Sequence, residues 1–298
     1  MFLQLAKGML YFFLTGLGIV GNISVFVHYI CSFGGGTEKI SIQLILIDVV
    51  FTNIIMLLSK GLPRTIAAFG LRNFLDDIGC KTVVYLERLS RGLSMCTSSL
   101  LTAIQAIIIS PGVSGWRRLK LSSARHILPF LLFFWILNSL ISMNLLNSTT
   151  DASINTSQSN KNDYYCNVVL ENQKVNSIFL TLMVVRDVVS QSIMGGASGY
   201  MIFLLYRHHQ HVLYLHNSKF LYKTPPEIKA AQSVLLLMIC FLFFYWTDCL
   251  ICLYLTFSFE SNSIIVYIQE FLTLGYAILS PFVLIHRDGH LSEYCHAQ

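Results

Sequence analysis

The sequence predicts an all-α membrane protein, a bundle of seven transmembrane helices with its N-terminus outside the cell. Two observations support this fold class. First, seven long apolar stretches occupy most of the chain, and a transmembrane helix needs about 20 apolar residues to cross a hydrocarbon core of roughly 30 Å. Second, 54% of the 298 residues are hydrophobic and only 12% are charged, a composition that does not suit a soluble domain of this length.

The apolar stretches place the helices in order along the chain. We expect them at roughly 9–30, 41–62, 82–109, 127–147, 176–206, 230–256 and 264–286. No connecting segment is long enough to separate two soluble units, so residues 1–298 are predicted to form a single transmembrane domain. Residues 287–298 are expected to form a short cytoplasmic tail.

The distribution of Lys and Arg predicts the orientation of the chain. With the N-terminus outside, the cytoplasmic segments hold ten of these cations and the outer segments hold seven, with Lys60 and Arg64 among the outer ones. Cytoplasmic loops of membrane proteins carry such an excess. We therefore attribute the net charge of +5 to contact with anionic lipid headgroups and an acidic partner protein, and not to contact with nucleic acid.

Two cysteines are expected on the outer, oxidising side of the membrane. Cys80 directly precedes the third apolar stretch, and Cys166 lies in the long polar segment after the fourth. A Cys80–Cys166 disulfide is the pairing that this topology favours. Glycosylation sequons begin at Asn147, at the end of the fourth stretch, and at Asn155, which lies further from the membrane.

Ionisable residues inside the predicted helices are costly in a bilayer and indicate a polar interior. On the third helix Glu87, Arg91 and Ser94 fall on one stripe, and Glu87 and Arg91 are close enough to pair. Polar groups at a similar depth on three other helices complete a predicted small-molecule pocket in the outer half of the bundle. The candidate pocket residues are Glu87, Arg91, Ser94, Arg186, Asp187, Ser190, Tyr245, Asp248 and Glu270. The alternative is a set of salt bridges between helices, without a ligand.

Catalytic and metal-binding motifs are missing from the sequence. It contains no HExxH pair, no GxSxG elbow and no GxxxxGK phosphate loop, so we expect neither an enzyme nor a bound cofactor or metal. The basic segment at 207–211 holds three histidines, and we interpret it as a helix end at the membrane surface.

Several segments of the chain resemble those of one receptor family. They are Ser59–Pro63 (SKGLP), Ala67–Lys81 (AAFGLRNFLDDIGCK), Gln105–Pro111 (QAIIISP) and Ser280–Ile285 (SPFVLI). With the seven helices and the expected disulfide, they are similar to mammalian vomeronasal type-1 receptors, which are G-protein-coupled receptors. The resemblance spans nearly the whole chain and accounts for the absence of DRY and NPxxY motifs.

The resemblance implies a pheromone receptor of the plasma membrane. Such a receptor binds a small extracellular chemosignal and activates a heterotrimeric G protein, here of the inhibitory class. The residues expected to line the coupling cleft or attract the G protein are Ile109, Ser110, Arg117, Arg118, Tyr206, Arg207 and Lys229. The competing interpretation is a seven-helix transporter or channel that uses the intramembrane charges as an ion path.

Three candidate pocket residues depart from the family pattern. The family usually has a His where Glu87 stands and often a His where Arg186 stands, and the position of Asp248 is commonly small or neutral. We interpret these departures as tuning for one ligand. Since Arg186 stays charged at physiological pH and a guanidinium binds anions bidentately, it favours an anionic or neutral polar ligand. The alternative is a cationic ligand, which would contact Glu87, Asp187 or Asp248.

Overall fold

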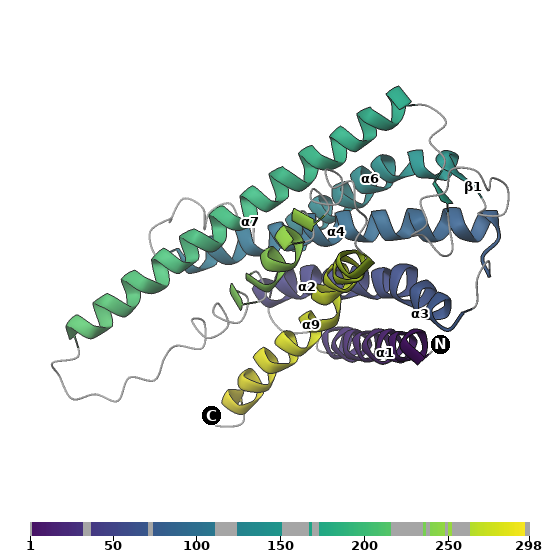
Figure 1. Ribbon diagram of the computed structural model, residues 1–298. Coiled ribbons are helices and arrows are strands. Elements are labelled where there is room, and N and C mark those ends of the chain that lie inside the picture. Colours follow the sequence, from purple (N-terminus) through teal and green to yellow (C-terminus); the bar gives the residue numbers. More distant parts are fainter. Residues whose placement is uncertain are drawn as a thin grey trace.

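The computed structural model describes residues 2–31, 37–70, 74–110, 124–150, 167–168, 173–215, 235–236, 239–247, 250–251 and 263–295. These residues are almost entirely helical, and Figure 1 shows the helices gathered into one bundle. The long helices are α1 (Phe2–Cys31), α2 (Thr37–Met56), α4 (Asp77–Ile109), α6 (Ala124–Ser148), α7 (Gln173–Leu215) and α9 (Ser263–Cys295). Residues 239–247, inside the sixth predicted helix, are also helical.

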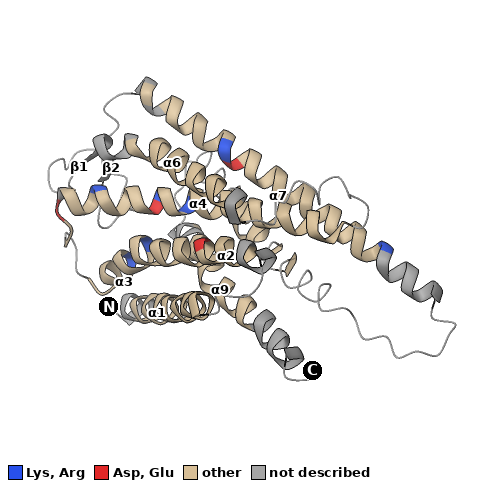
Figure 2. Cartoon of the chain, turned by 180° about the vertical axis from the view of Figure 1, so that it is seen from behind, with Lys and Arg blue, Asp and Glu red and all other residues tan. Residues whose placement is uncertain are grey.

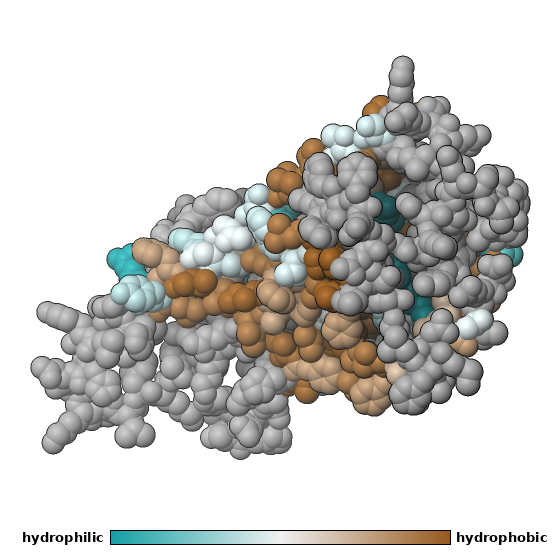
Figure 3. Space-filling view, in the orientation of Figure 1, coloured by the Kyte–Doolittle hydropathy of each residue, from teal (hydrophilic) through white to brown (hydrophobic). Residues whose placement is uncertain are grey.

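Among the described residues, four helical stretches are long and apolar enough to cross a membrane. They are Gly8–Cys31, Ile42–Ala68, Ile78–Ile109 and Ser177–Arg207, and shorter apolar stretches lie in α6 and α9. The outward faces of α1, α6 and α7 expose large apolar side chains, among them Phe13, Ile136 and Val188, and Figure 3 shows hydrophobic residues over much of the visible described surface. Apolar surface of this extent is typical of contact with lipid.

α4 lies at the centre of the bundle. It packs against α2, α6 and α7, whereas α1 packs against α2, α3 (Leu62–Ala68) and α9. α4 is correspondingly the most buried of the four long apolar stretches, and α7 is the most exposed. The chain ends lie at opposite ends of the bundle (Figure 1). We name these ends by α4: the Cys80 end, where α4 begins, and the Ser110 end, where it stops.

The second helical stretch continues further than its apolar run predicts. It runs without a break through α2, a π-helical turn η1 (Leu57–Gly61) and α3, to Ala68 instead of residue 62. Pro63 does not end the helix; it directly follows the π-helical turn, at the start of α3. Lys60, near the end of the predicted stretch 41–62, is a buried helix residue and is 7% exposed.

α7 and α9 also extend past the predicted spans. α7 continues to Leu215 beyond the predicted end at 206, and α9 continues to Cys295 through most of the segment predicted as a tail. Hydropathy detects only the part of a helix that lies in the hydrocarbon, whereas the backbone hydrogen bonds of a helix can continue into the headgroups and water.

Buried polar side chains connect the helices. Asn53 of α2 donates to Asn22 Oδ1 of α1 (3.3 Å) and to Ser280 Oγ of α9 (2.8 Å). Nearer the centre, the Asp48 carboxylate of α2 accepts from Thr97 Oγ1 of α4 (2.7 Å) and from Trp135 Nε1 of α6 (2.9 Å). In a lipid environment each such bond contributes about 0.6 kcal/mol on average, and together they fix which helix faces touch.

A short pair of strands lies beside the Cys80 end. β1 (Thr149–Thr150) follows α6 directly and pairs antiparallel with β2 (Asn167–Val168), with Thr149 opposite Val168. β1 also contacts α4. The residues that directly follow α6 therefore lie against α4.

Candidate functional site

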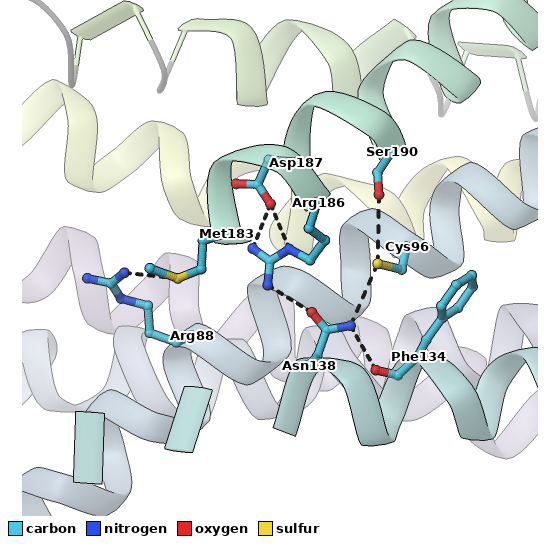
Figure 4. A network of polar contacts seen from close by, with 8 residues as sticks. All are labelled: Arg88, Cys96, Phe134, Asn138, Met183, Arg186, Asp187 and Ser190. Carbon is cyan, nitrogen blue, oxygen red and sulfur yellow. Dashed lines mark hydrogen bonds and ion pairs between the residues drawn. The ribbon is translucent and has the colours of Figure 1, made fainter. Parts of the chain in front are cut away.

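A polar network joins α4, α6 and α7 in the interior of the bundle (Figure 4). Arg186 of α7 is its centre: Nη1 donates to Asn138 Oδ1 of α6 (2.8 Å), while Nε and Nη2 donate to Asp187 Oδ1 (2.8 and 2.6 Å). Asn138 is fully buried and Arg186 is 9% exposed. These bonds hold the guanidinium between two helices.

Gly92 of α4 makes room for this contact. A Cβ atom at Gly92 would collide with both Asn138 Oδ1 and Arg186 Nη1. The network then continues along α4, since Asn138 Nδ2 donates to Cys96 Sγ (3.6 Å), which lies 3.7 Å from Ser190 Oγ of α7. Arg186 and Asn138 can therefore meet only over a residue without a side chain.

Three predicted pocket residues of α7, Arg186, Asp187 and Ser190, take part in this network. Their bonds, however, run to Asn138 and Cys96 and form a connection between helices. Asn138 was not among the predicted site residues, although a polar residue in the middle of an apolar run is a recognisable signal.

Glu87 forms a salt bridge between two helices. Its Oε1 lies 2.8 Å from Lys60 Nζ of η1, and the two side chains are 25% and 9% exposed. We expected Glu87 to pair with Arg91 on the same helix. The π-helical turn at Leu57–Gly61 instead carries Lys60 into the bundle, where it reaches the Glu87 carboxylate. Such turns are rare and are often found at functional sites.

Arg91 and Ser94 face the interior next to this salt bridge. The Arg91 guanidinium lies over the Tyr245 ring, 5.6 Å from its centroid, and that ring stacks on Phe241 (4.2 Å). Phe241 in turn meets Tyr276 of α9 edge-on, at 4.4 Å. Ser94 is 1% exposed, and its hydroxyl has no hydrogen-bond partner within the described part of the chain.

Several predicted site residues fall where the structure gives no side-chain description. Asp248, Cys166, Asn155, Arg117, Arg118 and Lys229 lie outside the described residues. Glu270 and Asn147 lie in α9 and in the last turn of α6, but their side chains are not described.

Cys80 is fully buried and disulfide-bonded, and the described cysteines Cys31, Cys96 and Cys240 are free. The pairing of Cys80 with Cys166 therefore stays a prediction; Cys166 directly precedes β2, whose partner β1 contacts α4.

The Ser110 end holds the described members of the predicted coupling set. Ile109 is the last residue of α4, and Ser110 Oγ lies 2.8 Å from Tyr200 OH of α7. Tyr206 and Arg207 follow along α7 and are exposed. The Ser110–Tyr200 hydrogen bond joins α4 to α7 at this end.

No group of three metal-ligating side chains occurs among the residues that the structure describes.

The chain is similar to a known family of receptors. The family model of the vomeronasal organ pheromone receptors matches residues 5–297. The chain is 32% identical over 284 residues to human vomeronasal type-1 receptor 4, covering 95% of this chain and 94% of that protein. It is 33% identical to human vomeronasal type-1 receptor 3, covering 96% and 92%. It is 28% identical to mouse vomeronasal type-1 receptor 46, covering 94% and 90%.

Proposed function

Because the chain belongs to the vomeronasal organ pheromone receptor family, we propose that it binds a small extracellular chemosignal inside its helix bundle and activates a heterotrimeric G protein. The observation that carries the proposal is the polar face of the central helix. Glu87, Arg91 and Ser94 lie on α4 between the second helical stretch and the sixth helix, away from lipid. Intramembrane charges facing a bundle interior are expected to serve binding.

The proposed site begins in the half of α4 nearer the Cys80 end and reaches the middle of the helix. Residues 87–94 are 10 to 17 positions after the first residue of α4, which places them about 15–26 Å along the helix axis. The charge distribution assigns the Cys80 end to the outside of the plasma membrane. A soluble ligand then enters from outside to reach Arg91 and Ser94. Asp248 and Glu270 belong to the proposed lining by their positions in the sequence.

We place G-protein coupling at the Ser110 end. Receptors of this type switch by separating helices at their cytoplasmic end, and the ligand favours the open arrangement. Here the Ser110–Tyr200 hydrogen bond connects α4 to α7 and is a contact that such a separation breaks. Arg117, Arg118 and Lys229 supply positive charge for an acidic G-protein surface. The family resemblance favours a partner of the inhibitory class.

Guanine-nucleotide exchange tests this function. Membranes from cells expressing the chain together with an inhibitory-class G protein are exposed to a panel of urinary steroids and volatile compounds. We expect at least one compound to raise exchange above that of membranes lacking the receptor. A ligand-dependent current in membrane patches without any nucleotide exchange would instead support a channel.

A further inference from the structure

The Lys60–Glu87 salt bridge holds an amine beside a carboxylate inside the bundle. Lys60 Nζ lies 2.8 Å from Glu87 Oε1, and the Lys60 side chain is 9% exposed. The turn η1, which carries Lys60, packs against α1, α4 and α9. Figure 2 shows basic residues of the α2–α3 region beside acidic and basic residues of α4. The amine is therefore shielded from bulk water, next to the face of α4 that is proposed to bind the ligand.

A shielded lysine beside a carboxylate has the two groups that imine formation requires. Burying two opposite charges is costly, and transfer of the ammonium proton across the 2.8 Å to Glu87 leaves a neutral amine and a neutral acid. Only the neutral amine is a nucleophile, and desolvated lysines are the ones that proteins use to form Schiff bases with carbonyl compounds. The Glu87 side chain is 25% exposed, so a small molecule can approach the pair.

We propose that Lys60 captures a small aldehyde or ketone as a reversible imine. Lys60 Nζ attacks the carbonyl carbon, and an amine proton moves to the oxygen to give a neutral carbinolamine. The carbinolamine hydroxyl then takes the proton of the Glu87 acid and leaves as water while the C–N bond becomes double. A protonated imine remains, paired with the Glu87 carboxylate. This chemistry rests on the proposed receptor function and names a ligand class for it.

The surroundings of Lys60 suit an uncharged, largely apolar carbonyl compound. The protonated imine carries the same single positive charge as the Lys60 ammonium, so the Glu87 carboxylate compensates either one. Capture therefore brings no additional ion into the bilayer, which would be costly. Leu57 of the same turn belongs to an apolar cluster with Leu274 and Ile278 of α9, and such side chains match the hydrocarbon part of an aldehyde or ketone.

Reductive trapping of the purified receptor in detergent tests this chemistry without any G protein. The probes are straight-chain aldehydes from propanal to nonanal with sodium cyanoborohydride, which reduces an imine to a stable secondary amine, and the corresponding alcohols are the controls. Peptide mass spectrometry locates the modified lysines. Lys81, a partly exposed lysine near the start of α4, is the internal reference.

Exposure and capture predict opposite orders of reaction for the two lysines. If exposure alone governed the rate, the buried Lys60 would react more slowly than Lys81. We expect at least one aldehyde to modify Lys60 about tenfold faster than Lys81 or more, because the bound aldehyde is held beside the amine. Modification of Lys60 no faster than that of Lys81 with every aldehyde would overturn the proposal. This comparison uses the wild type and needs no variant that folds.

A pair of variants tests whether binding itself depends on the imine. Lys60→Arg keeps a positive charge beside Glu87 but forms no imine, because a guanidinium stays protonated. Without cyanoborohydride, the most reactive aldehyde should raise the apparent Tm of the wild type and of the matched control Lys81→Arg by about 2 °C or more. It should leave Lys60→Arg unchanged, and an equal shift in Lys60→Arg would refute imine capture.

Nucleotide exchange distinguishes failure of this chemistry from failure of the receptor function. A Lys60 adduct that forms without any rise in exchange contradicts the proposed function and leaves imine capture standing. Exchange in the absence of an adduct at Lys60 with every aldehyde supports the receptor function and contradicts imine capture.

Discussion

At the scale of single residues, the buried charges act first as partners for one another. Arg186 illustrates this, because its donors are taken up by Asn138 and Asp187 over the Gly92 backbone. The Arg186 guanidinium could equally well bind the anionic group of a ligand. The packing of α4, α6 and α7 decides whether a guanidinium pairs with another side chain or contacts a ligand. The polar residues of one helix alone do not predict that packing.

Replacement of Arg186 separates the two roles. Arg186→Ala leaves Asn138 Oδ1 and the Asp187 carboxylate without their partner, and losing one member of a buried pair costs about 3–5 kcal/mol. We expect a lower apparent Tm and reduced surface delivery. Arg88→Ala is the control, since the Arg88 guanidinium contacts Met183 Sδ (3.3 Å) outside this pair. A variant as stable as the wild type with a weakened ligand response would make Arg186 a ligand contact instead.

Gly92 gives a steric prediction at the same site. Gly92→Ala inserts a methyl group where Asn138 Oδ1 and Arg186 Nη1 meet, so α6 and α7 must move away from α4. We expect destabilisation of about 1–3 kcal/mol, the range for overpacking, measured as a fall in Tm. Gly199→Ala on α7 is the matched control, because no described atom beyond its own helix lies within 4 Å of the place that the added methyl group would take. Equal Tm values for the two variants would argue against the close contact of Gly92 with Asn138 and Arg186.

At the scale of the elements, the π-helical turn in the second helical stretch has the largest consequence. It places Lys60 beside Glu87 of α4, at 2.8 Å, and with α3 it extends the helix to Ala68. Pro63 and the end of the apolar run suggested a helix end at residue 62. Arg64 was therefore expected beyond the helix and Lys60 only at its outer end, so the Lys60–Glu87 contact was not predicted.

A double-mutant cycle measures the Lys60–Glu87 connection. Lys60→Met or Glu87→Gln alone leaves one buried charge without its partner, so each should lower Tm. The double variant removes both charges and should be at least as stable as either single variant, because a buried ion pair roughly balances its desolvation cost. The coupling energy from the four melting curves is expected at about 1–3 kcal/mol. Additive effects of the two substitutions would show that the pair does not interact.

At the scale of the whole molecule, the sequence predicts the bundle well and its interior only in part. Long apolar runs report directly on helices that cross lipid, and the family resemblance extends over the whole chain. The presence of polar residues on the buried face of α4 was also predictable, because Glu87 and Arg91 interrupt an otherwise apolar helix. The Asn138–Arg186 and Lys60–Glu87 contacts were not, because each depends on a contact between helices far apart in sequence.

The most direct measurement compares ligand-dependent guanine-nucleotide exchange in the wild type, Arg91→Ala and Arg88→Ala at matched surface expression. A small molecule bound against α4 should drive exchange, and Arg91 should contact it. We predict that Arg91→Ala raises the half-maximal ligand concentration by about tenfold or more, equivalent to about 1.4 kcal/mol of lost binding, while Arg88→Ala stays close to the wild type. A wild-type dose response in Arg91→Ala would contradict a ligand site on this face of α4.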